Sequence, residues 1–182
     1  MENNITINID ENMLNIYFSI HNKYKNIAPL INVNLFKLFY TLTDDFYEKY
    51  QIYNDTNNTK FSSVILLKHF FKDIGISQKY IHIELLTTNK NNNNSNNITF
   101  DINTIHTTQN IDNNNIININ NNVELIHIKN GKCICNILNE NTIQIHIQMC
   151  MNNNELPKYL INIIKNIINK IINRIIYFMQ NM

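Results

Sequence analysis

One histidine and two cysteines lie within nine positions of one another in the segment ELIHIKNGKCIC, residues 124–135. His127, Cys133 and Cys135 are of the residue types that bind zinc, so the segment raises the question of a metal site. The answer depends on which faces of which elements carry these three side chains.

The dipeptide Asn130–Gly131 stands between alternating residues, which predicts a β-hairpin with a two-residue type I′ turn. In that hairpin His127 faces Ile134 across the ladder. Because side chains alternate along a strand, Cys133 and Cys135 then point away from His127. We therefore expect both cysteines to be buried apolar side chains and not zinc ligands.

The next segment, TIQIHIQMC, alternates between apolar and polar residues and predicts a further strand. A three-residue connection at residues 139–141 pairs Cys133 with Ile147 and Cys135 with Ile145. The cysteine face and the isoleucine face then coincide.

The remaining histidines offer little further chemistry. His146 shares a face with His127 but lies two strands away, about 9.5 Å, whereas ligands of one zinc ion lie only a few ångström apart. His82 and Glu84 lie on one face of a strand, where they could act as a base and its orienting carboxylate, and His106 could join them. No nucleophile or glycine-rich elbow accompanies them, so we expect a solvated polar face.

Composition bounds the class of protein. The 182 residues fit one domain, 1–182, with Asn-rich loops near 88–97 and 109–122. A formal charge of +1 gives no basic footprint for duplex nucleic acid, and two glycines exclude the usual phosphate-binding loops, so we expect no cofactor and no metal. Neither a signal peptide nor a transmembrane run is present, which favours a cytoplasmic protein.

Hydrophobic periodicity predicts an α+β domain. A short strand at residues 5–9 precedes an N-terminal helical layer, with helices expected at 10–20, 34–50 and 62–75. Gly75 is expected to end the third helix in a left-handed conformation, with Ile76 packed on Phe71. The period then changes to two, which indicates an antiparallel sheet of about five or six strands. The segment 155–182 has isoleucines at helical spacing and predicts a long amphipathic helix packed on the sheet.

This order of elements is similar to the helix-grip architecture of START and Bet v 1-like domains, in which a curved antiparallel sheet wraps a C-terminal helix. The helical region expected before Gly75 is larger than the pair of short helices usual in that architecture. The order also resembles half of a TATA-binding-protein fold. The resemblance concerns the order of elements and carries no sequence motif.

Three functions remain open. The lack of a catalytic signature favours a non-enzymatic interaction or accessory domain with an unknown protein partner, and its expected surface consists of Tyr40, Tyr47, Tyr50 and Tyr53. The alternative is a helix-grip-like carrier of a small apolar ligand, with a cavity lined by Phe100, Cys133, Cys135, Ile145, Ile147 and Met149. A third possibility is peripheral membrane attachment through the terminal helix, but the sheet requires the same apolar stripe.

Overall fold

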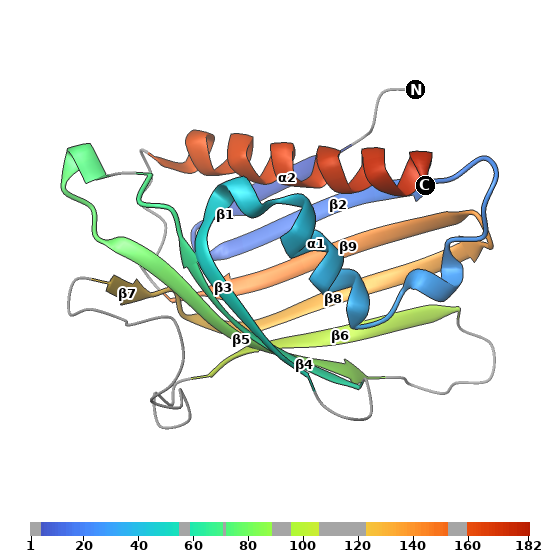
Figure 1. Cartoon of the computed structure of the whole chain (residues 1–182), viewed down its shortest axis with the longest axis horizontal. Helices are drawn as coiled ribbons and strands as arrows, with labels where there is room; N and C mark the ends of the chain where they lie inside the picture. The colour runs from blue at the N-terminus through green and yellow to red at the C-terminus, as the bar shows by residue number, and fades with distance from the viewer. Residues whose placement is uncertain (1–4, 55–58, 71, 89–95, 106–122, 153–159) are drawn as a thin grey trace.

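The computed structural model describes residues 5–54, 59–70, 72–88, 96–105, 123–152 and 160–182. In this part of the chain, one nine-stranded sheet carries two α-helices on one face (Figure 1). The strands are β1 Thr6–Asp10, β2 Met13–His21, β3 Tyr47–Asn54, β4 Lys60–Leu67, β5 Gln78–Thr88, β6 Asn97–Thr104, β7 Val123–Leu125, β8 Ile128–Asn139 and β9 Thr142–Met151. The helices are α1 Asn34–Leu42 and α2 Ile161–Asn181, with 3-10 turns η1 Ala28–Leu30, η2 Asp44–Phe46 and η3 Lys72–Ile74.

The strands follow the order β1-β2-β9-β8-β6-β5-β4-β3 across the sheet. All neighbours in this path are antiparallel, and β7 adds a short parallel pairing to the start of β5. The predicted fold class, an antiparallel sheet with a long C-terminal helix packed on it, is confirmed. The sheet is larger than the predicted five or six strands, because part of the expected helical layer is sheet.

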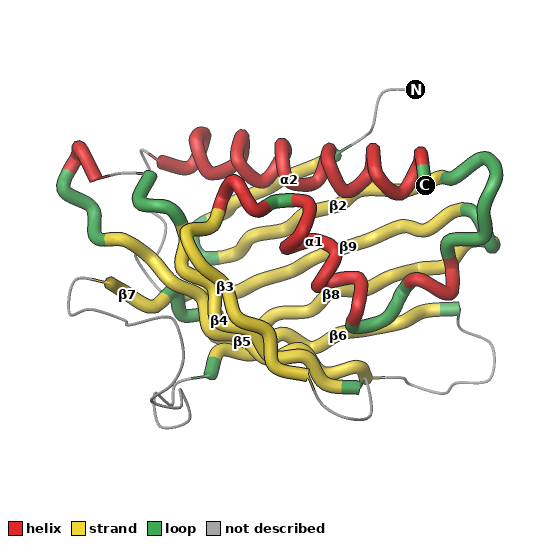
Figure 2. The backbone as a smooth tube through the Cα atoms, viewed as in Figure 1, coloured by secondary structure: helices red, strands yellow, loops and turns green. Residues whose placement is uncertain are grey.

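Both helices lie on the same face, called the inner face below (Figure 2). Helix α2 packs along β1 and β2 and meets α1. The side-chain amide of Asn22, just after β2, donates a hydrogen bond to the carbonyl of Met179 at 2.8 Å. The last turn of α2 therefore lies at the end of β2, and its first turns lie at the beginning of β2 (Figure 1).

The helix expected at residues 10–20 is wrong, because this segment is strand β2. Its apolar residues at helical spacing also fit a period of two, in which Leu14, Ile16, Phe18 and Ile20 are all buried on the inner face. In an antiparallel ladder that alternation buries one whole face, so the tertiary environment decides between the two periods.

The helix expected at residues 62–75 is also wrong, because most of this apolar run forms β4. Its side chains are buried on both faces: Ile65 joins the main core, while Val64 and Leu66 form a second small core with Tyr80 on the outer face. A strand covered on both faces has no polar alternation to identify it. Gly75 does adopt the expected left-handed conformation, with φ +74°. The expected contact of Ile76 with Phe71 lies outside the described residues.

The segment 34–50 is helical only in its first half. Helix α1 ends at Leu42, a 3-10 turn follows, and the chain then enters edge strand β3 at Tyr47. The hydroxyl of Thr43 donates to the carbonyl of Phe39 at 2.7 Å and also lies 2.7 Å from the Tyr47 hydroxyl. A buried threonine bonded in this way stabilises the end of the helix.

The expected hairpin turn at Asn130–Gly131 is wrong, because β8 passes straight through both residues. Gly131 lies on the inner face between Ile102 and Met149, where a Cβ would stand 3.0 Å from the Ile102 Cβ. The glycine therefore permits a close side-chain approach, and no turn is made there. The hairpin connection is at Glu140 and Asn141 instead.

The register predicted across the connection at residues 139–141 is confirmed, whereas the predicted pairing of His127 with Ile134 is wrong, because Ile134 pairs with His146. Cys133 pairs with Ile147 and Cys135 pairs with Ile145 across β8 and β9. Both cysteines are buried on the inner face, as predicted. The prediction that both cysteines lie on the inner face is correct although the predicted turn is wrong, because it depends on alternation along β8 and on the connection to β9.

Candidate functional site

The histidine and cysteines that suggested a metal site do not form one. Cys133 and Cys135 lie on the inner face with their Sγ atoms 3.9 Å apart, while His127 lies before β8 begins. A hydrogen bond with Cys135, together with burial, raises the pKa of the Cys133 thiol, which keeps this thiol protonated and unreactive. Among the described residues, no group of three or more His, Cys, Asp or Glu could hold a metal ion.

His82 and Glu84 share the outer face but do not form a base and its orienting carboxylate. Glu84 makes an ion pair with Lys60 across β4 and β5. His82 is 9% exposed and lies opposite Val64, and its burial lowers its pKa, which favours the neutral imidazole. His106 lies outside the described residues.

His146 is also on the outer face, where its ring stacks on Tyr17 with centroids 3.8 Å apart and an interplanar angle of 18°. Burial lowers the pKa of His146, so the stacked ring is neutral at pH 7. We find no carboxylate paired with this histidine among the described ion pairs.

The four tyrosines of the predicted partner surface do not share one exposed face. Tyr40 is buried, with its hydroxyl 3.0 Å from the Ser63 hydroxyl, and burial raises its pKa. Tyr47 is half-buried and bonded to Thr43, and Tyr53 contributes to the small core on the outer face. Tyr50 alone of the four is exposed, at 40%.

The six residues predicted to line a cavity do come together on the inner face. The register places Phe100, Cys133 and Ile147 in one row across β6, β8 and β9, with Cys135 and Ile145 in the next row. Met149 lies on the other side of this row, beside Gly131. The wall that they form is continuous and apolar.

At the end of the interior where α2 finishes, this wall is fully covered. Ile20, Ile143, Ile176 and Met179 are all 0% exposed there, and they belong to one hydrophobic cluster. We call these four residues and their surroundings the packed end. Interdigitated aliphatic side chains leave no room for a ligand at this end.

At the opposite end, where α2 begins, the cover is uneven: Leu14 and Leu160 are buried, whereas other apolar side chains are only partly covered. Ile83, Ile147 and Met149 of the sheet and Ile164 and Ile168 of α2 are half-buried, and we call these five residues the part-covered end. In the first turn of α2, Ile163 is 46% exposed. Apolar surface left open on an inner face is unfavourable in water and is typical of a site that another apolar group covers.

The part-covered end is aliphatic and carries no charge among its five residues. Charged side chains at this end of the molecule include Lys165, which follows Ile164 in α2, and the ion pair of Lys79 in β5 with Glu124 in β7, at 2.5 Å. The arrangement offers no general base, nucleophile or cation ligand, and it can bind chiefly by burying an apolar surface.

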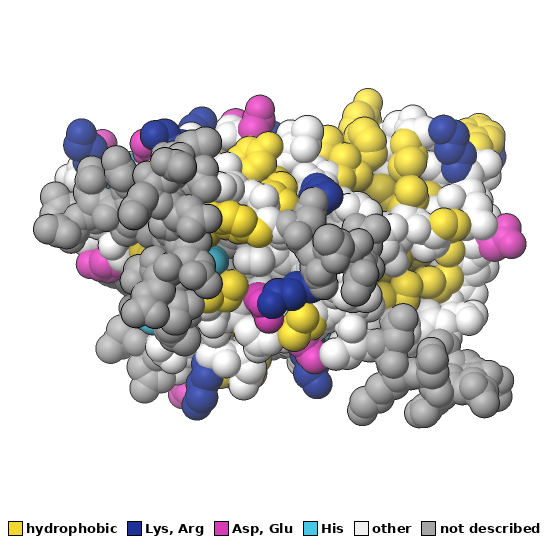
Figure 3. Space-filling view, turned by 60° about the horizontal axis from the view of Figure 1, so that its bottom comes forward, with side chains coloured by type: hydrophobic (Ala, Val, Ile, Leu, Met, Phe, Trp, Pro, Cys, Tyr) yellow, Lys and Arg dark blue, Asp and Glu magenta, His cyan; other side chains and the backbone are white. Residues whose placement is uncertain are grey.

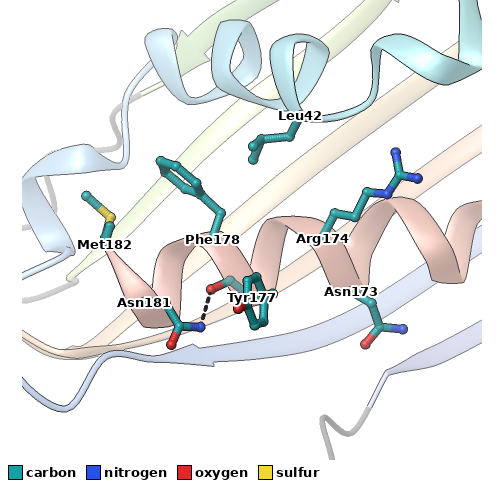
Figure 4. Close-up of a pocket in the computed structure, with 7 residues that line it drawn as sticks. All are labelled: Leu42, Asn173, Arg174, Tyr177, Phe178, Asn181 and Met182. Atoms are coloured by element: carbon teal, nitrogen blue, oxygen red, sulfur yellow. Dashed lines mark hydrogen bonds between the residues drawn. The ribbon is translucent and has the colours of Figure 1, made fainter.

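A groove lies between the end of α1 and the last turns of α2 (Figure 4). It is an open groove of about 700 Å³. Leu42 and Phe178 point toward one another across it, and Arg174 reaches from α2 to make a bidentate ion pair with Asp45. Arg174 also lies over the Phe46 ring, 5.3 Å from its centroid.

Sequence reasoning missed both the groove and the difference between the two ends. The isoleucines of α2 recur evenly along the helix, so nothing in their spacing shows that Ile172 and Ile176 are buried while Ile163 and Ile164 are not. That difference depends on where α1 covers the sheet, which the sequence pattern did not locate.

No protein-family model and no curated protein sequence matches the chain. Solved structures do match its fold. The chain is similar to human STARD10, with a TM-score of 0.64 and 6% identity over 97% of this chain and 72% of that chain. It is similar to the human StarD13 lipid transfer and protein localization domain, with a TM-score of 0.61 and 4% identity over 92% of this chain and 76% of that chain. A STAR-related lipid transfer protein from Xanthomonas axonopodis matches 96% of this chain and 98% of its own, with a TM-score of 0.54 and 9% identity. At these identities the likeness establishes a START-like helix-grip fold.

Proposed function

We propose that the protein is a carrier that holds an apolar ligand between the sheet and α2 at the part-covered end. The observation that carries the proposal is the incomplete cover of aliphatic side chains on an otherwise buried inner face, at Ile83, Ile147, Met149, Ile164 and Ile168. Covering this surface with a hydrocarbon ligand is favourable by about 25 cal/mol for each Å² removed from water.

The fold supports the same proposal. Two of the similar structures are named for lipid transfer. The likeness covers 76% of the human StarD13 domain and 98% of the protein from Xanthomonas axonopodis. The absence of charge at the part-covered end suits a hydrocarbon chain or ring system, whose polar group would remain toward solvent. The protein-interaction role predicted from the sequence has less support, because Tyr50 alone of its four tyrosines is exposed.

Two measurements test the proposal. Purified protein extracted with organic solvent is expected to release a hydrophobic molecule that mass spectrometry detects. In solution, the delipidated protein is expected to bind a fluorescent fatty-acid probe in a saturable manner, because the part-covered end excludes water from the probe.

Substitutions in β9 locate the site. Ile147→Trp is expected to fill the part-covered end and abolish probe binding, while Gln144→Trp on the exposed outer face of the same strand is expected to bind as the wild type does. Equal probe binding by the wild type and both folded variants contradicts the proposed site. A protein that neither releases a hydrophobic molecule nor binds the probe contradicts the function.

A further inference from the structure

We propose that the part-covered end takes a ligand with one unbranched hydrocarbon chain of medium length, and not a sterol or a two-chain phospholipid. This inference rests on the proposed function and names the class of ligand that the same site can hold. The geometry that carries it is the narrow outline of the uncovered surface on β9, which buried side chains border on both neighbouring strands.

The uncovered surface of β9 is one strand wide. Ile147 is half-buried, but its neighbours in the same row, Ile16 on β2 and Cys133 on β8, are 4% and 3% exposed. Met149 in the next row also has buried neighbours on both strands. Ile83 is half-buried too, but it lies three strands away on β5 and does not widen this strip. Neighbouring strands lie about 4.8 Å apart, which gives room for one extended hydrocarbon chain and not for two side by side.

The strip ends at a closed row of side chains toward the packed end. In this row Phe18 of β2, Ile145 of β9 and Cys135 of β8 are 4%, 3% and 0% exposed. We call these three residues the floor. They belong to the main hydrophobic cluster, so their packing leaves no path along β9 for a longer chain.

Aromatic side chains close the interior on the side of β4 and β6. The Phe36 ring of α1 packs edge-on against Phe100 of β6, with centroids 5.1 Å apart and an interplanar angle of 81°. The same ring lies 6.2 Å from the Phe61 ring of β4. Phe61 and Phe100 are both 0% exposed. The fused rings of a sterol would have to displace this aromatic cluster, whose packed contacts stabilise the fold.

Helix α2 limits the length of the site. No helix in the described part of the chain is long and apolar enough to cross a membrane. In α2, Ile164 and Ile168 are half-buried, while Leu160 before them and Ile172 after them are both 3% exposed. From the rise of an α-helix, the two half-buried isoleucines are about 6 Å apart along the axis and the two buried residues about 18 Å apart. An extended chain of about eight to ten carbons has a length between these two values.

The surface of the packed end is the competing place for a hydrocarbon. At the right of Figure 3, hydrophobic side chains gather on the surface of this end. Tyr24 and Tyr177 are 81% and 70% exposed, and Tyr177 lines the open groove between α1 and α2. A hydrocarbon on such an open surface meets no floor, so its affinity would continue to rise with chain length. The dependence of affinity on chain length therefore separates the two places.

A series of straight-chain fatty acids that displace the fluorescent fatty-acid probe from the full chain tests the length of the site. Each methylene added from hexanoic to decanoic acid is expected to lower the dissociation constant about four-fold, because it is buried in the site. From decanoic to hexadecanoic acid, the dissociation constant is expected to change by less than about four-fold in total, because the added methylenes stay in water. All ligands are used below their critical micelle concentrations.

Two phospholipids with the same head group test the width of the site. Dioctanoylphosphatidylcholine is expected to displace the probe no more tightly than octanoyl-lysophosphatidylcholine, because the second chain finds no room. Cholesterol supplied from cyclodextrin is expected not to displace the probe. A dissociation constant that keeps falling through hexadecanoic acid, a gain of about ten-fold or more from the second chain, or displacement by cholesterol overturns the inference while leaving the proposed function intact. A protein that binds no hydrophobe at all contradicts the proposed function itself.

Truncation of the floor tests where the chain ends. Ile145→Ala is expected to bind hexadecanoic acid about four-fold or more tightly than the wild type and to bind hexanoic acid equally, because only the longer chain reaches the floor. Ile145→Val removes a single methylene-sized group and is expected to act in the same direction to a smaller extent, in a fold that is barely changed. Tyr177→Ser in the groove is the matched control and is expected to bind the whole series as the wild type does. Weaker binding of the series by Tyr177→Ser, with no change in either Ile145 variant, overturns the inference.

Discussion

The two ends of the interior differ in how completely they are covered, although the same strands and the same helix build both. Strands β2 and β9 run the whole length of the inner face, and α2 lies over it from its first turn to its last. At the packed end Ile143 is 0% exposed, while Ile147, four residues later on the same face of the same strand, is half-buried. An apolar pattern therefore indicates which face is inner, but the tightness of packing is a property of the assembled layers.

Paired truncations on β9 test this difference and carry the largest expected effect. Ile143→Ala is expected to lower the free energy of unfolding by about 2–5 kcal/mol, because it leaves a cavity among fully buried side chains. Ile147→Ala is expected to lower the free energy of unfolding by about half that amount or less, since the Ile147 side chain is already partly exposed. Urea denaturation of both variants measures the two values, and equal losses contradict the distinction between the ends.

The glycine of β8 sharpens the comparison, because it sets the spacing of the wall beside the part-covered end. Gly131→Val is expected to destabilise the fold by about 1–3 kcal/mol, as its Cβ would lie 3.0 Å from the Ile102 Cβ and 3.2 Å from the Gln148 carbonyl oxygen. Thermal unfolding measures the loss. Gly75→Ala serves as the contrast, because its site has open space and only the left-handed backbone opposes the change.

Asn22 ties the last turn of α2 to the packed end. Its Oδ1 accepts bonds from the amides of Tyr24 and Lys25, both at 2.8 Å, while its amide group donates to Met179. Asn22→Ala is expected to cost about 1–2 kcal/mol, because buried backbone groups lose their partners. Hydrogen exchange is expected to show faster opening of the final turns of α2. Asn26→Ala, in the exposed part of the same loop, is the control and is expected to change neither quantity by much.

The ion pair of Arg174 with Asp45 is expected to give the smallest effect, since both side chains are nearly half exposed. Its hydrogen bond to Arg174 holds the pKa of the Asp45 carboxyl below the usual 3.8. The ion pair therefore stabilises the folded protein fully at pH values above 3.8. This stabilisation is lost as the pH falls through the lower pKa that Asp45 has in the folded protein. Arg174→Ala and wild type are expected to differ slightly in thermal midpoint at neutral pH and to converge in acid. A difference in thermal midpoint that grows in acid contradicts this role. Lys60→Ala, which removes the ion pair with Glu84 on the outer face, is the comparison variant.

The parts of the fold that could be predicted are those in which the hydrophobic residues fit only one periodicity, either that of a helix or that of a strand. Helix α2 has isoleucines at helical spacing opposite lysines and asparagines, and no strand pattern accounts for them. The pairing of Cys133 with Ile147 followed from strict alternation along β8 and β9. Both features depend on local pattern and on one short connection.

The errors arose where a local signal and the tertiary environment disagree. Asn130–Gly131 is the preferred sequence of a type I′ turn, yet Gly131 is required for close packing against Ile102 and Met149. The apolar run of β4 reads as a helix because Val64 and Leu66 are buried on the outer face. The candidate site shows the same kind of error. The residues that form its wall were predicted, but how far each is exposed depends on how the helices pack on the sheet, which the sequence of a single segment does not determine.

The central claim is that an apolar ligand occupies the part-covered end and not the packed end. Photo-cross-linking with a diazirine fatty acid, followed by peptide mapping, tests it most directly. Adducts are expected on Ile147, Met149 and Ile168, and unlabelled fatty acid is expected to compete for them. Adducts on Ile143, Ile176 and Met179, or adducts spread over the surface without competition, would contradict it.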